Sequence, residues 1–205
     1  MNNPVVRGPL RVALAVVAAV GVGVSCGGST SLDGAAPPAY GVAPNLAGTP
    51  TMLFPVQAVS GGVGRTEVDR ELQFAVSEAG ADWLFPEDLA ALIARSPNLD
   101  VPLEQLPVGV FLQAEVERVG DPLFGYLRRL NAVTEARVAV IPVLAAPVVD
   151  AESDTERWEI RTAVVDAQRG FVIWFGSTES TAVAGGPPPI AGVAQRLVQR
   201  FIPAR

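Results

Sequence analysis

Few of the side chains that carry out chemistry in proteins are present in this sequence. It contains no histidine, and all 15 basic residues are arginine, so lysine is absent as well. The missing imidazole excludes histidine acid–base catalysis and histidine metal ligands. The missing amine excludes Schiff-base lysines and Ser–Lys dyads. One thiol, Cys26, and 21 carboxylates remain as candidates.

Three groups of carboxylates have spacings that occur in functional sites. The acids that alternate through residues 150–156 resemble the start of a calcium loop, but the glycine and the late glutamate of such a loop are missing. The pairs Glu87/Asp88 and Glu115/Glu117 each supply two acids, as glycoside hydrolysis requires, yet nothing in the sequence brings either pair into a cleft. We expect solvated surface charge at all three, with no catalytic residue and no metal site.

A glycine-rich segment, residues 60–66, lies between a predicted strand and a predicted helix, where phosphate-binding loops occur. A phosphate loop needs Gly-Lys-Ser/Thr after an earlier glycine, whereas Arg65 replaces the lysine and Val59 stands at the early glycine position. A dinucleotide motif would need glycine at the position of Glu67. We therefore predict a flexible connector and no cofactor.

The only cysteine, Cys26, follows a segment with the three parts of an export signal. Arg7 and Arg11 supply positive charge, residues 12–24 form an apolar run, and Ser25 is small. The run is too short for a membrane-spanning helix, which needs about 20 residues. We predict a signal peptide at residues 1–25. A lone thiol forms no internal disulfide, so the position of Cys26 explains it better than redox chemistry does.

Gly23-Val24-Ser25-Cys26 resembles the lipobox of bacterial lipoproteins, with Gly23 where leucine is usual. The resemblance implies that Cys26 is acylated and becomes the mature amino terminus. Gly27 replaces the aspartate that retains such proteins in the inner membrane, which implies the periplasmic face of the outer membrane. The alternative is an ordinary secretory signal followed by a chance cysteine. Residues 26–49, rich in Gly, Ala, Pro and Ser, are predicted to be the lipidated cysteine and a flexible tether.

Residues 50–205 predict one α/β domain. Hydrophobic periodicity and turn residues predict strands at 51–57, 82–85, 137–146, 157–165 and 171–177, and helices beginning at Thr66, Pro86 and Pro122 and near Ile190. Thr66 and Asp69 resemble a capping box. Pro142 predicts an edge strand or a bulge. The alternation of charges from Arg157 to Arg161 predicts a half-exposed strand in a hairpin that turns at Gln168–Gly170.

The predicted order is β-α-β-α-α-β-β-β-α, a mixed sheet of about five strands with helices packed on it and the first two strands parallel. Residues 97–120 follow no clear pattern. The segments 52–56, 163–166 and 170–174, with the last amphipathic helix, resemble a domain shared by the TolB amino-terminal region, the curli-secretion lipoprotein and the penicillin-binding-protein activator lipoprotein. The resemblance implies this architecture and an envelope setting, and it carries no catalytic residue.

Charge and anchor together indicate a function class. Cleavage after residue 25 removes two arginines and no acid, so the net charge falls from −6 to −8, which disfavours nucleic-acid binding. We expect a non-enzymatic, membrane-anchored lipoprotein of the cell envelope that binds or helps assemble a protein partner, docking at a sheet edge near residues 137–146. The alternatives are a structural or transport accessory for outer-membrane biogenesis and a carboxylate-based hydrolase.

Overall fold

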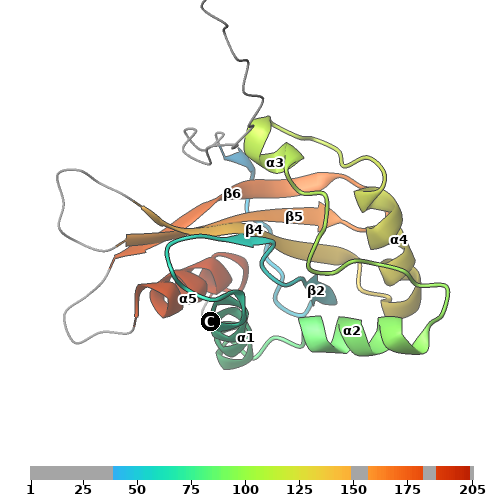
Figure 1. Ribbon diagram of the computed structural model, residues 1–205, viewed down its shortest axis with the longest axis horizontal. Coiled ribbons are helices and arrows are strands. Elements are labelled where there is room, and N and C mark those ends of the chain that lie inside the picture. The colour runs from blue at the N-terminus through green and yellow to red at the C-terminus, as the bar shows by residue number, and fades with distance from the viewer. Residues whose placement is uncertain (1–38, 149–156, 182–187, 204–205) are drawn as a thin grey trace, which may run out of the picture. The chain divides into compact units, whose positions relative to one another are not determined.

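A mixed sheet of six strands, with helices on both faces, forms the centre of the structure, a computed structural model that describes residues 39–148, 157–181 and 188–203 (Figure 1). The strands are β1 (Tyr40–Gly41), β2 (Thr51–Leu53), β3 (Ala58–Val59), β4 (Val138–Val148), β5 (Arg157–Asp166) and β6 (Val172–Thr181). The helices are α1 (Arg65–Glu78), α2 (Pro86–Arg95), α3 (Val110–Gln113), α4 (Leu123–Thr134) and α5 (Pro189–Phe201). The predicted α/β class is confirmed.

The strand order is β1-β6-β5-β4-β2, with β3 also paired to β4. β2 and β3 run parallel to β4, and the other pairs are antiparallel. The predicted strand over residues 51–57 is confirmed only as β2, which ends at Leu53, and β3 begins just after the predicted range on the same side of β4. Residues 82–85 make only a parallel bridge between Leu84 and Met52. The parallel direction is as predicted, but the second strand is reduced to one contact.

β4 lies inside the sheet, between β5 and the pair β2/β3, so the predicted edge at Pro142 is wrong. The predicted bulge is confirmed, because the register between β4 and β5 shifts between Pro142 and Leu144. The nitrogen of Pro142 lies on the same side as its carbonyl, toward β2 and β3, where it falls between the residues that pair with those two strands. Its missing N–H therefore removes no hydrogen bond to β5. On the β2/β3 side of β4, the Pro142 carbonyl accepts a hydrogen bond from the N–H of Gln57 at 2.9 Å.

β5 and β6 form the predicted hairpin. Gly170 takes the left-handed conformation, with φ 74°, and its N–H donates to the Asp166 carbonyl at 2.7 Å. The predicted half-exposed character of β5 is wrong. Glu159 is buried, and Arg161 keeps only 11% of its side-chain surface exposed. The alternating charges of this strand belong to a buried ion pair and do not indicate a solvent-exposed face.

Two apolar cores lie on the two faces of the sheet. α1 and α5 cover one face, where Trp174 meets Phe201 edge-to-face at 5.3 Å between ring centroids. α2, α3 and α4 contribute to the other core, where Phe111 stacks on Phe175 at 5.7 Å. Residues 97–120, which the sequence left unassigned, hold α3 and several buried apolar side chains of this second core. Those side chains are Leu99, Val101, Leu106, Val108, Phe111 and Val119.

The domain begins earlier in the chain than the sequence predicted. Tyr40 and Gly41 pair with Phe175 and Trp174 of β6, and Leu46 is 2% exposed in the core beneath α5. The Leu46 N–H donates to the Phe201 carbonyl at 2.8 Å. Burying one leucine contributes about 2 kcal/mol, which fixes this stretch to the fold. Residues 40–49 therefore pack as part of the domain, although the sequence placed them in the tether.

Candidate functional site

The site residue predicted from the sequence, Cys26, lies outside the described residues, and so does the acidic segment 150–156. Lipidation of Cys26 remains a prediction. In the part of the chain that the structure describes, no helix is both long enough and apolar enough to span a bilayer. The candidate sites among the described residues lie on the domain surface and in its polar clusters.

The predicted docking edge at residues 137–146 is not an edge. Backbone groups of β4 pair on both sides, and residues 138–145 are buried. On the side away from β4, β6 lies next to β5 (Figure 1), and the short β1 pairs with its outer side only at Trp174 and Phe175 among the described residues. Proline in a strand indicates a ladder defect, but the defect in β4 is an internal bulge.

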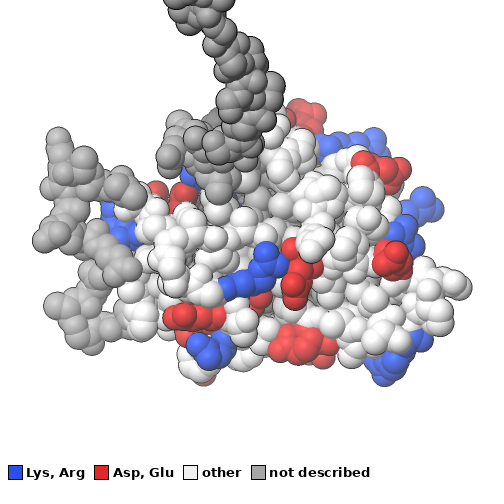
Figure 2. All heavy atoms as spheres, in the orientation of Figure 1, with Lys and Arg blue, Asp and Glu red and all other residues white. Residues whose placement is uncertain are grey.

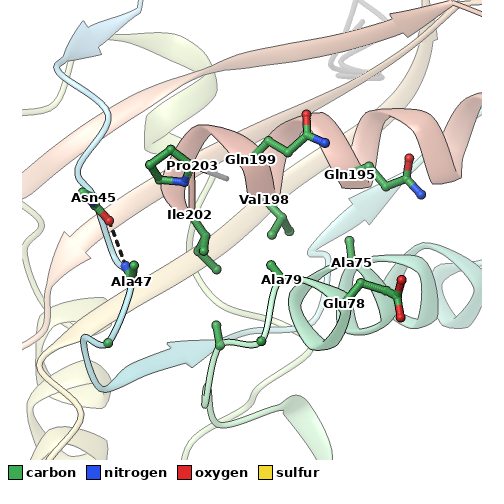
Figure 3. Close-up of a pocket in the computed structure, with 13 residues that line it drawn as sticks. Asn45, Ala47, Ala75, Glu78, Ala79, Gln195, Val198, Gln199, Ile202 and Pro203 are labelled. Atoms are coloured by element: carbon green, nitrogen blue, oxygen red, sulfur yellow. Dashed lines mark hydrogen bonds between the residues drawn. The ribbon is translucent and has the colours of Figure 1, made fainter. Parts of the chain in front are cut away.

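A groove of about 1060 Å³ runs between α1 and α5 and is closed at one end by residues 45–48 (Figure 3). Its walls combine small apolar residues with four polar side chains. Asn45, Glu78, Gln195 and Gln199 provide amides and one carboxylate. Asn45 Oδ1 accepts a hydrogen bond from the N–H of Ala47 at 3.0 Å, which orients its amide along the groove wall. These side chains offer hydrogen-bond donors and acceptors, and they provide no pair for proton transfer.

Asp69 is the one described carboxylate whose pKa is clearly displaced. Burial raises its pKa from 3.8 to about 6, against the opposing effects of a hydrogen bond from Val56 and the nearby charge of Arg65. The Val56 N–H donates to Asp69 Oδ1 at 2.7 Å. Asp69 does not complete the predicted capping box, because Gly64 is the N-cap of α1 and no side chain caps it. The carboxylate instead joins α1 to the turn between β2 and β3.

A second polar connection lies beside Asp69 and holds residues 101–106 in place. Gln57 donates to the Leu103 carbonyl at 2.9 Å and accepts from the N–H of Leu106 at 2.8 Å. Arg65 donates to the Gln57 and Glu104 carbonyls, each at 2.9 Å. Residues 101–105 and α2 border an open apolar hollow of about 480 Å³. The side chains of Gln57 and Arg65 are thus used to position the loop.

Glu159, Arg161 and Ser177 form a buried polar cluster that the sequence did not predict. Arg161 donates to Glu159 Oε1 through both Nε, at 2.8 Å, and Nη2, at 2.6 Å. The Ser177 hydroxyl donates to Glu159 Oε2 at 2.8 Å. The i, i+2 spacing of opposite charges in an otherwise apolar strand was the signal for this cluster, since strand residues two apart share a face. Every oxygen of the carboxylate is satisfied.

The remaining candidates are structural. Glu87 Oε2 accepts from Gln73 at 2.8 Å and Asp88 Oδ2 from the Phe85 N–H at 2.9 Å, while Glu115 and Glu117 are exposed. Each tryptophan is buried: Trp83, Trp158 and Trp174. Within residues 39–148, 157–181 and 188–203, no three His, Cys, Asp or Glu side chains gather as a metal site would require. Acidic and basic side chains are interspersed over the surface seen in Figure 2.

No protein-family model matches the chain, and no curated protein matches it. Solved structures do. The PelC dodecamer from Paraburkholderia phytofirmans has 10% identity and a TM-score of 0.44, and the match covers 82% of this chain and 98% of that one. The LpoB C-terminal domain from Salmonella enterica has 14% identity and a TM-score of 0.42, covering 72% and 85%. A lipoprotein from Neisseria meningitidis has 14% identity and a TM-score of 0.40, covering 74% and 91%.

The structure from Neisseria meningitidis is that of a lipoprotein. The expected resemblance is confirmed as one of fold. Likeness at this level of identity concerns architecture and does not extend to activity, ligand or partner.

Proposed function

We propose that this protein is a lipoprotein of the bacterial cell envelope, held at the periplasmic face of the outer membrane by a lipid on Cys26. Its domain acts as a non-enzymatic binding or assembly module for a protein partner. The observation that carries the proposal is the position of the chain's only cysteine, directly after a charged and apolar export signal and a small residue.

The chemistry of the domain supports binding over catalysis. The sequence has neither imidazole nor amine side chains, and the groove between α1 and α5 offers amides and a single carboxylate. Asp69 has a raised pKa, as catalytic acids often do. Its Oδ1, however, is engaged by a backbone N–H inside the fold. The polar groups of the domain thus position its own backbone or form hydrogen bonds at its surface.

The distance between anchor and domain supports a partner near the membrane. The first described strand, β1, begins at Tyr40, so thirteen residues, 27–39, separate it from Cys26 in the sequence. A Gly- and Ser-rich linker of that length has a root-mean-square reach of about 20 Å. A protein held so closely meets other proteins of the same membrane at high effective concentration.

Mass spectrometry of the mature protein tests the anchor. We expect an acylated amino terminus at Cys26, and Cys26→Ser should move the chain out of the membrane fraction. Gly27→Asp, which keeps the cysteine, should shift the chain from outer- to inner-membrane density in a sucrose gradient. Cleavage downstream of an unmodified Cys26, or unchanged fractionation of Cys26→Ser, contradicts the proposal.

Cross-linking in intact cells tests the binding role. A specific protein adduct of the wild-type chain, lost when Cys26→Ser releases the domain from the membrane, is the expected result. A purified chain that turns over a substrate, with turnover abolished by one carboxylate substitution, contradicts the non-enzymatic role.

A further inference from the structure

The two outer edges of the sheet are covered to different extents. At the β2 edge, the Leu84 N–H donates to the Thr51 carbonyl and the Leu53 N–H to the Leu84 carbonyl, at 2.9 and 2.8 Å, so residues 82–85 close it. At the β6 edge, Val172 donates to the Glu117 carbonyl at 2.9 Å, and β1 pairs with Trp174 and Phe175. From Gly176 to Glu179, no strand among the described residues pairs with the outer side of β6.

The backbone groups of β6 that point away from β5 can be identified, because the direction of these groups alternates along a strand. In an antiparallel strand, successive residues direct their N–H and C=O groups to opposite sides. The Glu179 carbonyl points away from β5, since it accepts a hydrogen bond from Arg196 of α5 at 3.2 Å. Ser177, two residues earlier, therefore also directs its backbone groups outward. The outer N–H groups of Ser177 and Glu179 are available to an added strand.

The stretch of sequence directly before β1 is a poor source of that strand. β1 pairs antiparallel, with Tyr40 opposite Phe175 and Gly41 opposite Trp174. Continued backwards in the same register, the chain would bring Pro38 and Pro37 opposite Ser177 and Thr178. Proline has no N–H to donate to a ladder. The edge also lacks the lysines and prolines by which exposed strands commonly discourage pairing.

The charge beside this edge selects the kind of partner. Glu179 is exposed and lies directly opposite Glu159 in the register of β5 and β6. Like charges at directly opposite positions are unfavourable. Arg161 already neutralises Glu159, while no arginine of the described residues forms an ion pair with Glu179. A basic side chain on an added strand would compensate Glu179. A second copy of a chain with net charge −6 is the less suitable occupant.

We infer that the β6 edge from Gly176 to Glu179 is the docking site for an extended strand of a protein partner, which carries a basic residue beside Glu179. This inference rests on the proposed function, because it names the surface through which the partner is held. The backbone hydrogen bonds of the added strand supply affinity, and the basic side chain supplies selectivity.

Carbodiimide coupling in membranes from cells that express the full chain tests this assignment. The reagent joins a carboxylate directly to a lysine amine, and this chain has no lysine, so lysine-linked adducts contain another protein. Two pairs of variants separate binding at the β6 edge from binding elsewhere on the domain. Ser177→Pro removes the outward N–H, and Ser177→Ala removes only the hydroxyl. Glu179→Arg reverses the charge at the edge, and Glu78→Arg makes the same change at the groove between α1 and α5.

We expect Ser177→Pro to lower the amount of partner adduct about tenfold, the effect of losing roughly 1.4 kcal/mol of binding free energy. Glu179→Arg removes a coupling carboxylate as well as the charge, so we expect it to lower the partner adducts formed at the chain's other carboxylates too. Ser177→Ala and Glu78→Arg should leave the adduct at the wild-type level. Melting curves check that each variant is folded. If Ser177→Pro does not fold, Glu179→Arg still tests the assignment. A peptide map that joins Glu179 itself to a partner lysine would support the assignment further.

Three results would overturn it. An unchanged adduct in Glu179→Arg shows that the partner does not use this edge. Loss of the adduct in Glu78→Arg alone assigns binding to the groove, so the inference fails while the proposed function stands. A membrane-bound wild-type chain that forms no adduct at any carboxylate contradicts both.

Discussion

Asp69 and Glu159 are two carboxylates removed from water in different ways. Glu159 is met by an arginine and a hydroxyl, so its charge is balanced within the sheet. Asp69 receives one backbone N–H, and burial raises its pKa to about 6. The fold therefore gives one acid a cationic partner and leaves the other with a single backbone N–H and a pKa of about 6. Removing a partner should cost far more at the first site than at the second.

The largest effect is expected from Arg161→Met. It leaves the Glu159 carboxylate buried without its cation, which should lower the free energy of unfolding by about 3–5 kcal/mol. Thermal or urea unfolding measures the loss. The double variant Arg161→Met/Glu159→Gln should recover most of it, since no buried charge remains. Equal stability of the single and double variants would show that the ion pair is not buried in solution.

A smaller loss is expected from Asp69→Ala. The Val56 N–H then has no acceptor, which costs about 1–3 kcal/mol. Asp69→Asn is the matched control, because its amide oxygen can still accept this hydrogen bond. Urea unfolding at pH 7 should rank the chains with Asp69→Asn near the wild type and Asp69→Ala clearly below it. A reversed order would contradict the role of Asp69 as an acceptor.

The pH dependence of stability should come largely from Asp69 between about pH 4 and 6. Its pKa is 3.8 when unfolded and about 6 when folded, so the folded chain holds the proton more tightly. As the pH rises through this window, the unfolded chain loses its proton first and the free energy of unfolding falls, by about 1 kcal/mol once solvent screening is allowed for. Above pH 6 this contribution is constant. Melting curves of Asp69→Asn should lack the decline.

The smallest effect is expected at Glu179, which lies opposite Glu159 in the sheet. Glu179→Gln removes a like charge from the position directly opposite Glu159 and should raise the free energy of unfolding by about 0.3 kcal/mol. The same substitution should weaken the partner adduct. A gain in stability with a loss of binding would show that Glu179 is kept for recognition. A loss of both would indicate a structural role.

Local patterns predicted the elements that depend on local rules. α2 begins at Pro86 as expected, and Gly170 turns the hairpin. Predictions that depend on distant partners were less successful. Pro142 indicated a defect in the ladder, but only β2 and β3 show that the strand is internal. Charges in β5 looked solvent-facing because the sequence does not show that Arg161 folds back onto Glu159. Leu46 appeared to be part of a linker because its partner, Phe201, is at the far end of the chain.

The hydrogen bond between Leu46 and Phe201 has a mechanical consequence. The chain enters the domain through β1 and residues 45–48, and α5 ends against those residues. A pull applied ahead of Tyr40 is resisted first by two residues of β1 and then by Leu46 and its bond to α5. The central strands β4 and β5 come into the path of the force only after these contacts. Tension on the amino-terminal end would therefore load the pairing of β1 with β6 first and the wall of the groove second, before it reached β4 and β5.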